Sequence, residues 1–361
     1  MKRPVSLKDI ASSTGVSAMT VSRVVNGDKR VKKTTRLLIL DAIRQMGYSK
    51  DVFASINAEK RRGIKQRKHV LINFPMNYFR EKEFFNFFSL INLKIISELQ
   101  ASRIDYSLIH IDGDDISGNI DEITRSDVMI HCGRCSGASL DAMKELNRNA
   151  KHICICFQGE KTFSVQPDDI AGGRLAADHF HKKGHRHIMC LTHADDESLV
   201  SRAIAFASEL KRRDPSSNTD MLYYPSGRRD DETAMKESML DKYFSVNNPS
   251  GIFVPNGYDT MIVYKYLRKK NMRIPDDMSL LGYDELEFYD YIETPLSRIA
   301  FTPDAIGKAA SAMIIDILEE RCGDELKTII PVSLTDKGSV KHVKRIYKNT
   351  EKISCEYSGS K

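Results

Sequence analysis

The sequence has no long hydrophobic run and few cysteines. Its densest apolar stretch, Phe84–Leu93, is interrupted by Asn86, Ser89 and Asn92, so no segment reaches the ~18 apolar residues that a membrane span needs. The seven cysteines, an odd number without regular spacing, are typical of reduced thiols in a cytosol. Near the N-terminus, Asp9 precludes the apolar core of a secretory signal. We therefore expect a soluble cytoplasmic protein with no membrane partner.

The sequence also lacks the motifs that most often carry catalysis or phosphate binding. It contains no Gly-Lys-Ser/Thr loop, no G-x-S-x-G elbow and no H-E-x-x-H helix. Cys132 and Cys135 form one C-x-x-C pair without a second, and His179–His187 holds four histidines without an acid or cysteine at ligand spacing. Packing explains both groups better than zinc or redox chemistry. We therefore expect no catalytic residue, no metal site and no cofactor.

The chain is long enough for several domains, and its charge is unevenly distributed. Its 361 residues, 41% hydrophobic and 29% charged, are typical of a globular protein with two or three domains. Residues 1–69 contain 17 Lys and Arg against 5 Asp and Glu, although the whole chain carries only +6. A basic head on an acidic body indicates that the head alone meets a polyanion such as nucleic acid.

The N-terminal segment has the pattern of three short helices. Ser6 has the form of an N-cap, and the first helix breaks at Gly15, where glycine allows the positive φ of a tight turn. Ser17 offers a second cap, and Asn26-Gly27 ends the second helix. A third helix runs from about Lys33 to Met46. A helix, a glycine turn, a helix and a supporting helix together predict a helix-turn-helix head.

The second helix of such a head exposes its first turn to the major groove of DNA. In this sequence Arg23 can bond two acceptors of guanine, whereas Ala18 and Met19 can offer only apolar contacts, for example to a thymine methyl group. Polar residues nearby suit the phosphates, which set position without reading sequence: Ser17, Thr20, Ser22 and Asn26. A three-helix bundle that binds protein is the alternative, and the basic charge argues against it.

Four segments carry a family resemblance: Leu7-Lys8-Asp9-Ile10-Ala11, Gly15-Val16-Ser17, Thr20–Asn26 and Gly47-Tyr48. In these segments the chain resembles the DNA-binding head of the LacI/GalR bacterial repressors. The resemblance implies base contacts at Ala18, Met19 and Arg23, and it adds Leu7 to the expected DNA contacts. It also implies a homodimer on a near-palindromic operator in double-stranded DNA.

The segment after the head departs from the family pattern. Members of the family have a hinge helix there, which folds on DNA and inserts a leucine into the minor groove. Here Asn57 stands where that leucine belongs, and Ile56 could insert only if the register slips by one residue. We include both residues among the expected DNA contacts. Lys60–Lys68 then holds six basic residues in nine, which predicts a strap that touches phosphates.

From His69 onward, apolar runs of strand length alternate with helical patterns. This alternation predicts parallel doubly wound sheets, in two lobes because about nine such units exceed one sheet. Ligand chemistry is then expected at the carboxyl ends of the strands. The predicted strands are Val70–Phe74, Tyr106–Ile111, Val128–Cys132, His152–Phe157, Ile188–Leu191, Met221–Tyr224, Gly251–Val254 and Ser279–Gly282. The predicted helices are Phe87–Ser102, Ala171–Lys182, Leu199–Arg212, Asp231–Phe244 and Asp259–Lys269.

The body also resembles the sensor core of the LacI/GalR family. The similar segments include Asp168-Asp169-x-x-Gly172-Gly173, Ser198-x-x-x-Arg202 and Gly282-Tyr283-Asp284. The resemblance implies a two-lobed core built like a periplasmic sugar-binding protein, with three chain crossings between the lobes. It implies effector contacts at Arg202, Asn256 and Asp284, with Ser198 in the same pocket and Gln158 at a site that is often Asp in sugar-sensing members.

These contacts leave the effector open. Arg donates in a planar fork, Asp accepts two hydroxyls and Asn does both, so the set suits vicinal diols or a purine edge. A sugar or sugar derivative is the leading interpretation, a purine or nucleoside the second, and a partner protein docking on the core the third. In another interpretation, Arg202 and Asp284 only pair with each other and hold the lobes together.

The sequence therefore predicts a transcriptional regulator, most simply a repressor, whose operator affinity a small molecule controls, in a bacterial cytoplasm on the nucleoid. The predicted parts are a head at 1–49, a hinge and basic linker at 50–69, a core at 70–340 and a polar tail at 341–361. Lobe 1 is expected at about 70–160 and 296–324, and lobe 2 at about 161–295 and 325–340. The tail lacks apolar heptads, which favours a dimer over a coiled-coil tetramer.

Overall fold

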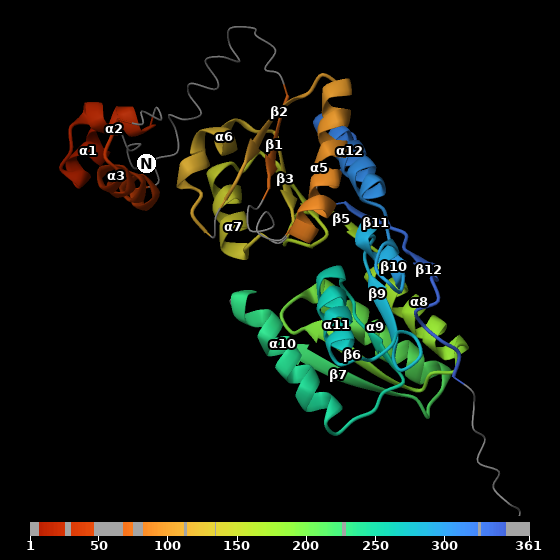
Figure 1. Ribbon diagram of the computed structural model, residues 1–361. Coiled ribbons are helices and arrows are strands. Elements are labelled where there is room, and N and C mark those ends of the chain that lie inside the picture. The colour runs from red at the N-terminus through yellow and green to blue at the C-terminus, as the bar shows by residue number, and fades with distance from the viewer. Residues whose placement is uncertain are drawn as a thin grey trace, which may run out of the picture.

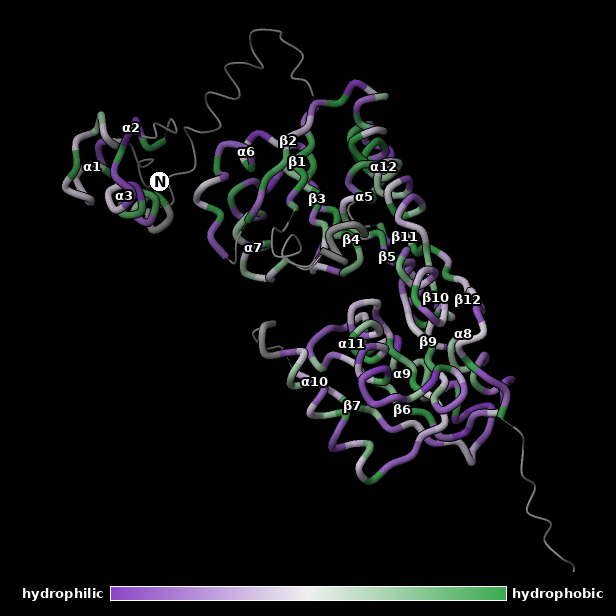
Figure 2. The backbone as a smooth tube through the Cα atoms, in the orientation of Figure 1, coloured by the Kyte–Doolittle hydropathy of each residue, from purple (hydrophilic) through white to green (hydrophobic). Residues whose placement is uncertain are grey.

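The computed structural model shows a small helical head and two α/β lobes (Figure 1). It describes residues 7–25, 30–46, 68–74, 82–111, 114–133, 135–225, 229–323 and 326–343. Figure 2 shows hydrophobic residues following the strands of both lobes, where the cores lie. No helix in these ranges is long and apolar enough to cross a membrane.

The head consists of α1 (Leu7–Thr14), α2 (Ala18–Val25) and α3 (Lys33–Met46). Gly15 lies in the turn between α1 and α2 with φ +69°, the left-handed conformation that glycine adopts without strain. The core of the head is formed by one residue of α1, two of α2 and one of α3, all buried: Ile10, Val21, Val24 and Ile39. The helix-turn-helix prediction is therefore confirmed.

The first lobe is a six-stranded sheet in which every pairing is parallel. The strand order is β11-β5-β4-β3-β1-β2. These strands are β1 (His69–Asn73), β2 (Asp105–Ile109), β3 (Val128–Cys132), β4 (Lys151–Ile155), β5 (Phe163–Pro167) and β11 (Lys327–Ile330). The helices α5 (Lys82–Ala101) and α12 (Pro303–Leu318) pack side by side on one face, and α6 (Ile120–Arg125) and α7 (Gly137–Leu146) cover the other (Figure 1).

The second lobe has a sheet of the same size, with the order β12-β10-β9-β8-β6-β7. All pairings are parallel except the one between β10 and β12. Its strands are β6 (His187–His193), β7 (Asn218–Tyr224), β8 (Gly251–Phe253), β9 (Ser279–Tyr283), β10 (Ser297–Ala300) and β12 (Ser333–Thr335). Its helices are α8 (Asp169–Lys182), α9 (Glu197–Arg213), α10 (Arg229–Phe244) and α11 (Gly257–Lys269).

The chain crosses between the lobes three times, but at other points than predicted. Residues 163–167 belong to the first sheet, where β5 pairs with β4, although we placed them in lobe 2. Residues 297–300 belong to the second sheet, where β10 pairs with β9, although we placed them in lobe 1. Residues 327–330 return to the first sheet beside β5. Each of these strands spans at most five residues, and only pairing with distant strands assigns it to a sheet.

Candidate functional site

The helix α2 is positioned by a side-chain cap and by two buried valines. Oγ of Ser17 accepts a hydrogen bond from the Thr20 backbone N–H at 3.1 Å and lies 2.8 Å from Oγ1 of Thr20. This bond satisfies one of the N–H groups that the first helical turn leaves without a partner. Val21 and Val24 face the core of the head, so the remaining side of α2 faces solvent.

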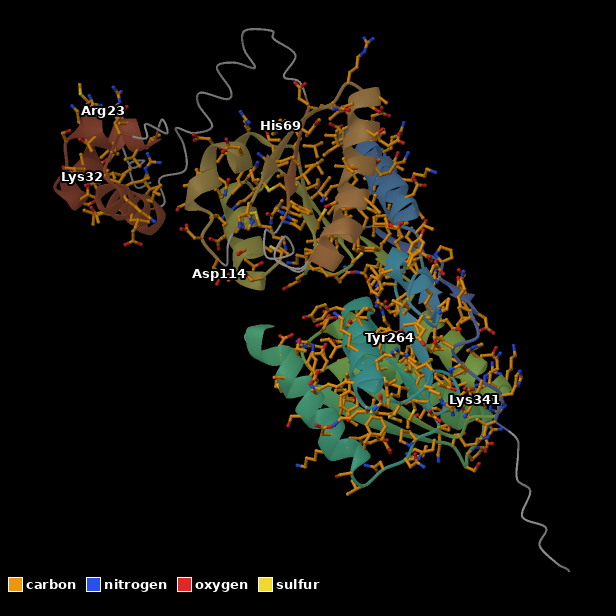
Figure 3. The ribbon with its side chains drawn as sticks, viewed as in Figure 1. Arg23, Lys32, His69, Asp114, Tyr264 and Lys341 are labelled. Carbon is orange, nitrogen blue, oxygen red and sulfur yellow. The ribbon has the colours of Figure 1, made fainter. Side chains whose placement is uncertain are left out.

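The solvent side of α2 presents the residues that we expected to meet DNA. Met19 is 67% exposed, and Arg23, one turn later, is also exposed and lies on the outer surface of the head (Figure 3). Ala18, Thr20 and Ser22 are half-buried beside them. One helix side therefore combines a guanidinium with apolar groups, as major-groove readout requires.

The structure describes the other predicted DNA contacts only in part or not at all. Leu7 is the first residue of α1, and only its backbone is described. Asn26, Ile56 and Asn57 lie outside the described residues, as does most of the predicted hinge and linker.

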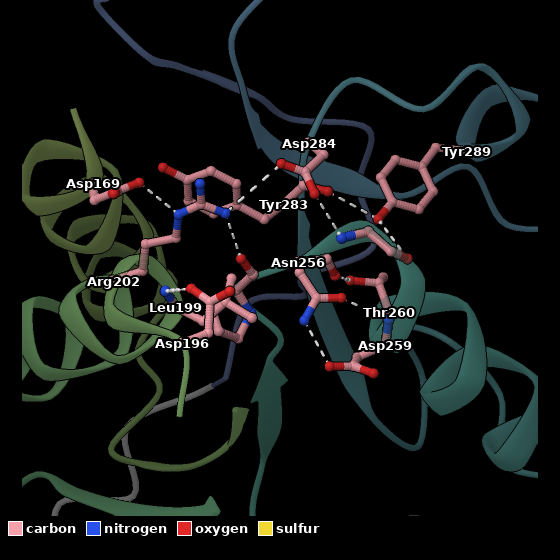
Figure 4. A network of polar contacts seen from close by, with 12 residues as sticks. Asp169, Asp196, Leu199, Arg202, Asn256, Asp259, Thr260, Tyr283, Asp284 and Tyr289 are labelled. Atoms are coloured by element: carbon pink, nitrogen blue, oxygen red, sulfur yellow. Dashed lines mark hydrogen bonds and ion pairs between the residues drawn. The ribbon is translucent and has the colours of Figure 1, made fainter. Parts of the chain in front are cut away.

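Apart from the solvent side of α2, a polar cluster lies at the carboxyl ends of the strands of the second lobe, around Arg202 on α9 (Figure 4). Nε of Arg202 donates to Oδ1 of Asp169 at 2.7 Å, and Nη1 donates to the Pro255 carbonyl at 2.8 Å. Nη1 also lies 3.7 Å from Oδ1 of Asp284, and the guanidinium sits 3.9 Å from the ring centre of Tyr283. Arg202 is only 5% exposed, and these four neighbours hold its guanidinium in place.

In this cluster, burial and charge pairing act in opposite directions on the pKa values of Arg202 and Asp284. Burial by itself would lower the pKa of Arg202, but Asp169, the Tyr283 phenol and Asp284 hold it above its ordinary value. Burial raises the pKa of Asp284, against the opposing effects of Arg202 and the Gly257 N–H. A buried carboxylate beside a buried guanidinium prefers a ligand that brings hydrogen-bond donors.

Asp284 follows β9 directly and has an unusual backbone conformation. Its φ is +70°, and Oδ2 accepts a hydrogen bond from the Gly257 N–H at 2.8 Å. The Tyr289 hydroxyl donates to the Tyr283 carbonyl at 2.9 Å and braces the same turn. A non-glycine residue in the left-handed region is uncommon and is often found at functional sites.

Asn256 lies in the same cluster as the N-cap of α11. Its Oδ1 accepts from the Asp259 backbone N–H at 2.7 Å, and its Nδ2 donates to Oδ2 of Asp259 at 2.6 Å. Ser198 lies in the first turn of α9, half-buried and one turn before Arg202. Four of the five expected effector contacts thus gather on one lobe: Ser198, Arg202, Asn256 and Asp284. Since Arg202 and Asp284 share a lobe, their pairing does not hold the two lobes together.

Gln158, the fifth expected contact, is not part of this cluster. It is exposed, and its Oε1 accepts hydrogen bonds within its own lobe from Ser164 at 3.0 Å and Gln166 at 3.1 Å. Cys156 takes the position at the end of β4 instead, with φ +64°. Burial raises the pKa of the Cys156 thiol, and the charged groups that also act on this pKa include Arg202, Asp169 and Asp284. Cys156 of the first lobe therefore lies near enough to the cluster for the charges of the cluster to act on its thiol.

Sequence reasoning missed Asp169 and Cys156 as members of the site. Asp169 had a signal, because it lies in the Asp168-Asp169 segment that carried the family resemblance. Cys156 had a weaker signal, since it immediately follows the last residue of a buried strand. Within the described ranges no group of three or more His, Cys, Asp or Glu side chains could hold a metal ion.

The chain matches two family models. Residues 6–51 match the model described as bacterial regulatory proteins, lacI family. Residues 177–340 match the model of the periplasmic binding protein-like domain. The first match covers the head with α2, and the second covers the helices and strands that carry Arg202, Asn256 and Asp284.

Curated relatives align over nearly their whole length. The HTH-type transcriptional repressor PurR of Vibrio cholerae serotype O1 (strain M66-2) is 24% identical over 330 residues, which cover 87% of this chain and 92% of the relative. The repressor of the same name from Mannheimia succiniciproducens is 24% identical over 351 residues, 93% of this chain and 99% of the relative.

Solved structures share the fold at low sequence identity. The lac repressor dimer bound to operator and the anti-inducer ONPF aligns with a TM-score of 0.63 and 19% identity, covering 94% of this chain and all of that one. The transcriptional regulator CelR in complex with cellobiose aligns with a TM-score of 0.64 and 20% identity, covering 93% of this chain and all of that one. The head, the two-lobed core and these similarities together show that the chain combines a lacI-family helix-turn-helix domain with a periplasmic-binding-protein-like core and is homologous to the PurR and lac repressors.

Proposed function

We propose that this regulator is a repressor that binds its operator through α2 and releases it when a small molecule binds the polar cluster around Arg202. The observation that carries the DNA-binding part is the solvent side of α2, where Arg23 and Met19 lie one turn apart over a packed valine core. Arg23 reads guanine and Met19 contacts a thymine methyl group. Ser17, Thr20 and Ser22 set the register on phosphates.

A sugar or sugar derivative is the effector that the cluster supports best. Asp284 accepts hydroxyl protons, Arg202 donates from the N–H groups that its fixed neighbours leave over, and Asn256 does both. CelR in complex with cellobiose, and an Enterococcus faecium regulator with bound ribose at TM-score 0.61 and 20% identity, support this assignment. A purine or nucleoside is the second candidate, since a guanidinium and a carboxylate also match a purine edge.

The proposed mechanism requires two copies of the chain. In a homodimer, the effector closes the two lobes of each subunit and changes the spacing of the heads. The effector can do this only through different affinities for the two dimer states. In this proposal the core senses its ligand and catalyses no reaction.

Two measurements test this function with the intact protein. Selection of bound fragments from a random DNA pool should enrich a near-palindromic site, and a uniform pool would contradict sequence-specific binding. Thermal-shift screening against sugars, nucleosides and purines should raise Tm for one class, because a ligand that binds the folded state stabilises it by mass action. If no compound of these classes raises Tm, the core instead responds to a partner protein.

A further inference from the structure

A buried lysine on α10 lies next to the effector cluster but outside it. Lys236 is 1% exposed, and its Nζ donates to Oδ1 of Asp259 at 2.6 Å. Glu232, one helical turn earlier, lies 3.4 Å from the same nitrogen. The ammonium also sits 3.9 Å from the ring centre of Tyr224 and 5.4 Å from that of Tyr258. A fully buried lysine is rare and is retained only where it is paired.

Asp259 connects this lysine to Asn256. Oδ2 of Asp259 accepts from Nδ2 of Asn256 at 2.6 Å and also from the Tyr224 hydroxyl. Burial raises the pKa of Tyr224, and the negative charge of Asp259 raises it further, so the phenol keeps its proton and donates. Three donors therefore surround one carboxylate, and Lys236 is the only one of the three that brings a charge.

This arrangement determines which way the Asn256 amide points. A carboxylate paired with an ammonium only accepts hydrogen bonds, so the Asn256 group against Oδ2 must be Nδ2. The other end of the amide meets the Asp259 backbone N–H at 2.7 Å, which requires Oδ1 there. A flipped amide would place acceptor against acceptor and donor against donor. The second N–H of the amide lies next to the Tyr224 hydroxyl, and one lone pair of Oδ1 remains for a ligand.

We propose that Lys236 is a positioning residue that acts through the Asp259 carboxylate and, together with the Asp259 backbone N–H, holds the side-chain amide of Asn256 for the effector. The inference rests on the proposed function in one respect, the contact of Asn256 with the effector. Lys236 itself does not touch the effector. Its ammonium holds the Asp259 carboxylate against Nδ2 of Asn256, and the oriented amide then presents a lone pair of Oδ1 to a hydrogen-bond donor of the effector.

A matched control variant exists in the same helix pair. Lys269 of α11 donates to Oε2 of Glu237 on α10 at 2.7 Å, and its side chain is 64% exposed. Lys236→Met and Lys269→Met each remove one ammonium that joins α10 to α11. Only the first of them changes the surroundings of Asp259.

The orientation of the amide is visible in the nuclear magnetic resonance spectrum of the full chain labelled with ¹⁵N-asparagine. The side-chain NH₂ signals of Asn256 are assigned by their loss in Asn256→Asp. In the wild type we expect two well-separated proton signals, one of them slow to exchange because it is held by Asp259. Lys236→Met should shift or average this pair, and Lys269→Met should leave it unchanged. An unchanged pair in folded Lys236→Met would overturn the proposal.

A second variant keeps the test decisive if Lys236→Met does not fold with an unpaired carboxylate. Lys236→Met/Asp259→Asn carries no buried charge at this position, and its amide can present either oxygen or nitrogen to Asn256. We expect a folded protein with doubled or averaged Asn256 signals. A single wild-type pair would show that the Asp259 backbone N–H and packing orient the amide without Lys236, and would contradict the proposal.

The functional consequence has its own measurement. The compound that raises the wild-type Tm most in the thermal-shift panel should bind Lys236→Met about tenfold more weakly than Lys269→Met, the loss expected for one misplaced hydrogen bond. Equal binding to the two variants would contradict a positioning role. If Asn256→Ala left effector binding unchanged, Asn256 would not contact the effector and the proposed function would be wrong. The spectrum would still test separately whether Lys236 orients the amide.

Discussion

The Arg202 guanidinium and the Asp169 carboxylate join two helices of one lobe, with Nε and Oδ1 2.7 Å apart. Asp169 begins α8, directly after the first crossing of the chain between the lobes, and Arg202 lies on α9. Arg202, the central residue of the polar cluster, is therefore tied to the crossing segment. In the proposed mechanism, a ligand that contacts Arg202 or Asp284 would therefore act directly on a segment that connects the lobes.

Removal of Asp284 should separate ligand sensing from DNA binding. Asp284→Asn keeps the shape and can still accept from the Gly257 N–H, but it loses the charge that faces Arg202. We expect unchanged operator affinity and a need for at least roughly tenfold more effector for release. Glu287→Gln, at an exposed position three residues later, is the control and should behave as wild type. Normal release by Asp284→Asn in fluorescence anisotropy would contradict the role of this carboxylate.

Removal of Arg23 should relax operator specificity at one base pair. The truncated side chain of Arg23→Ala leaves the guanine acceptors unpaired, at a cost of about 1–3 kcal/mol for the preferred base. Lys32→Ala removes an exposed charge elsewhere on the head and should weaken binding to all sequences alike (Figure 3). Competition binding with single-base operator variants measures both. Unaltered discrimination in Arg23→Ala would exclude Arg23 from base readout.

The close crossing of α8 and α9 should not tolerate a methyl group. A Cβ at Gly173 would lie 2.3 Å from the Arg202 carbonyl oxygen, which belongs to the backbone and cannot rotate away. We expect Gly173→Ala to lower the free energy of unfolding by about 1–3 kcal/mol and to weaken effector binding by displacing α9. Gly137→Ala has no atom within 4 Å of its Cβ and should be near neutral. Urea unfolding compares the two, and equal stabilities would show that α9 can move freely.

The buried histidine pair of the first lobe should make the fold acid-sensitive. Nε2 of His131 and Nδ1 of His152 are 3.0 Å apart on β3 and β4. Burial, together with the positive charge of Lys144, lowers the pKa of His152 to about 4, and burial lowers that of His131 well below its ordinary value. Below pH ~6.5 the unfolded chain binds protons that the folded chain cannot bind, so stability is complete above that pH and is lost as the pH falls towards 4.

For His152 alone this loss is about 2 kcal/mol at pH 5. His131→Phe/His152→Phe should therefore lose less stability than the wild type between pH 7 and pH 5. Urea midpoints measured at both pH values provide the check. Parallel losses in the two proteins would assign the acid sensitivity to other groups, such as His185, whose pKa burial also lowers to about 4.

The local elements of this protein follow from short stretches of its amino-acid sequence. Ser17 caps α2 and Gly15 turns the chain before it, and both features depend on neighbours only a few residues away. The eight predicted strands of the body all exist, because a buried parallel strand is a short continuous apolar run. The resemblance to the LacI/GalR sensor core selected Arg202, Asn256 and Asp284, and each of them follows such a run or lies early in a helix.

Which distant segments meet depends on how the whole chain packs. Hydrogen bonds to far strands assign β5, β10 and β11 to their sheets, and no local pattern records those partners. The same holds for side chains: Gln158 binds Ser164 and Gln166 within its own lobe, whereas the charges of the cluster act on Cys156. The contact of Lys236 with Asp259 joins residues 23 positions apart on two helices. Such contacts depend on how helices and sheets pack, which residue type and spacing alone do not specify.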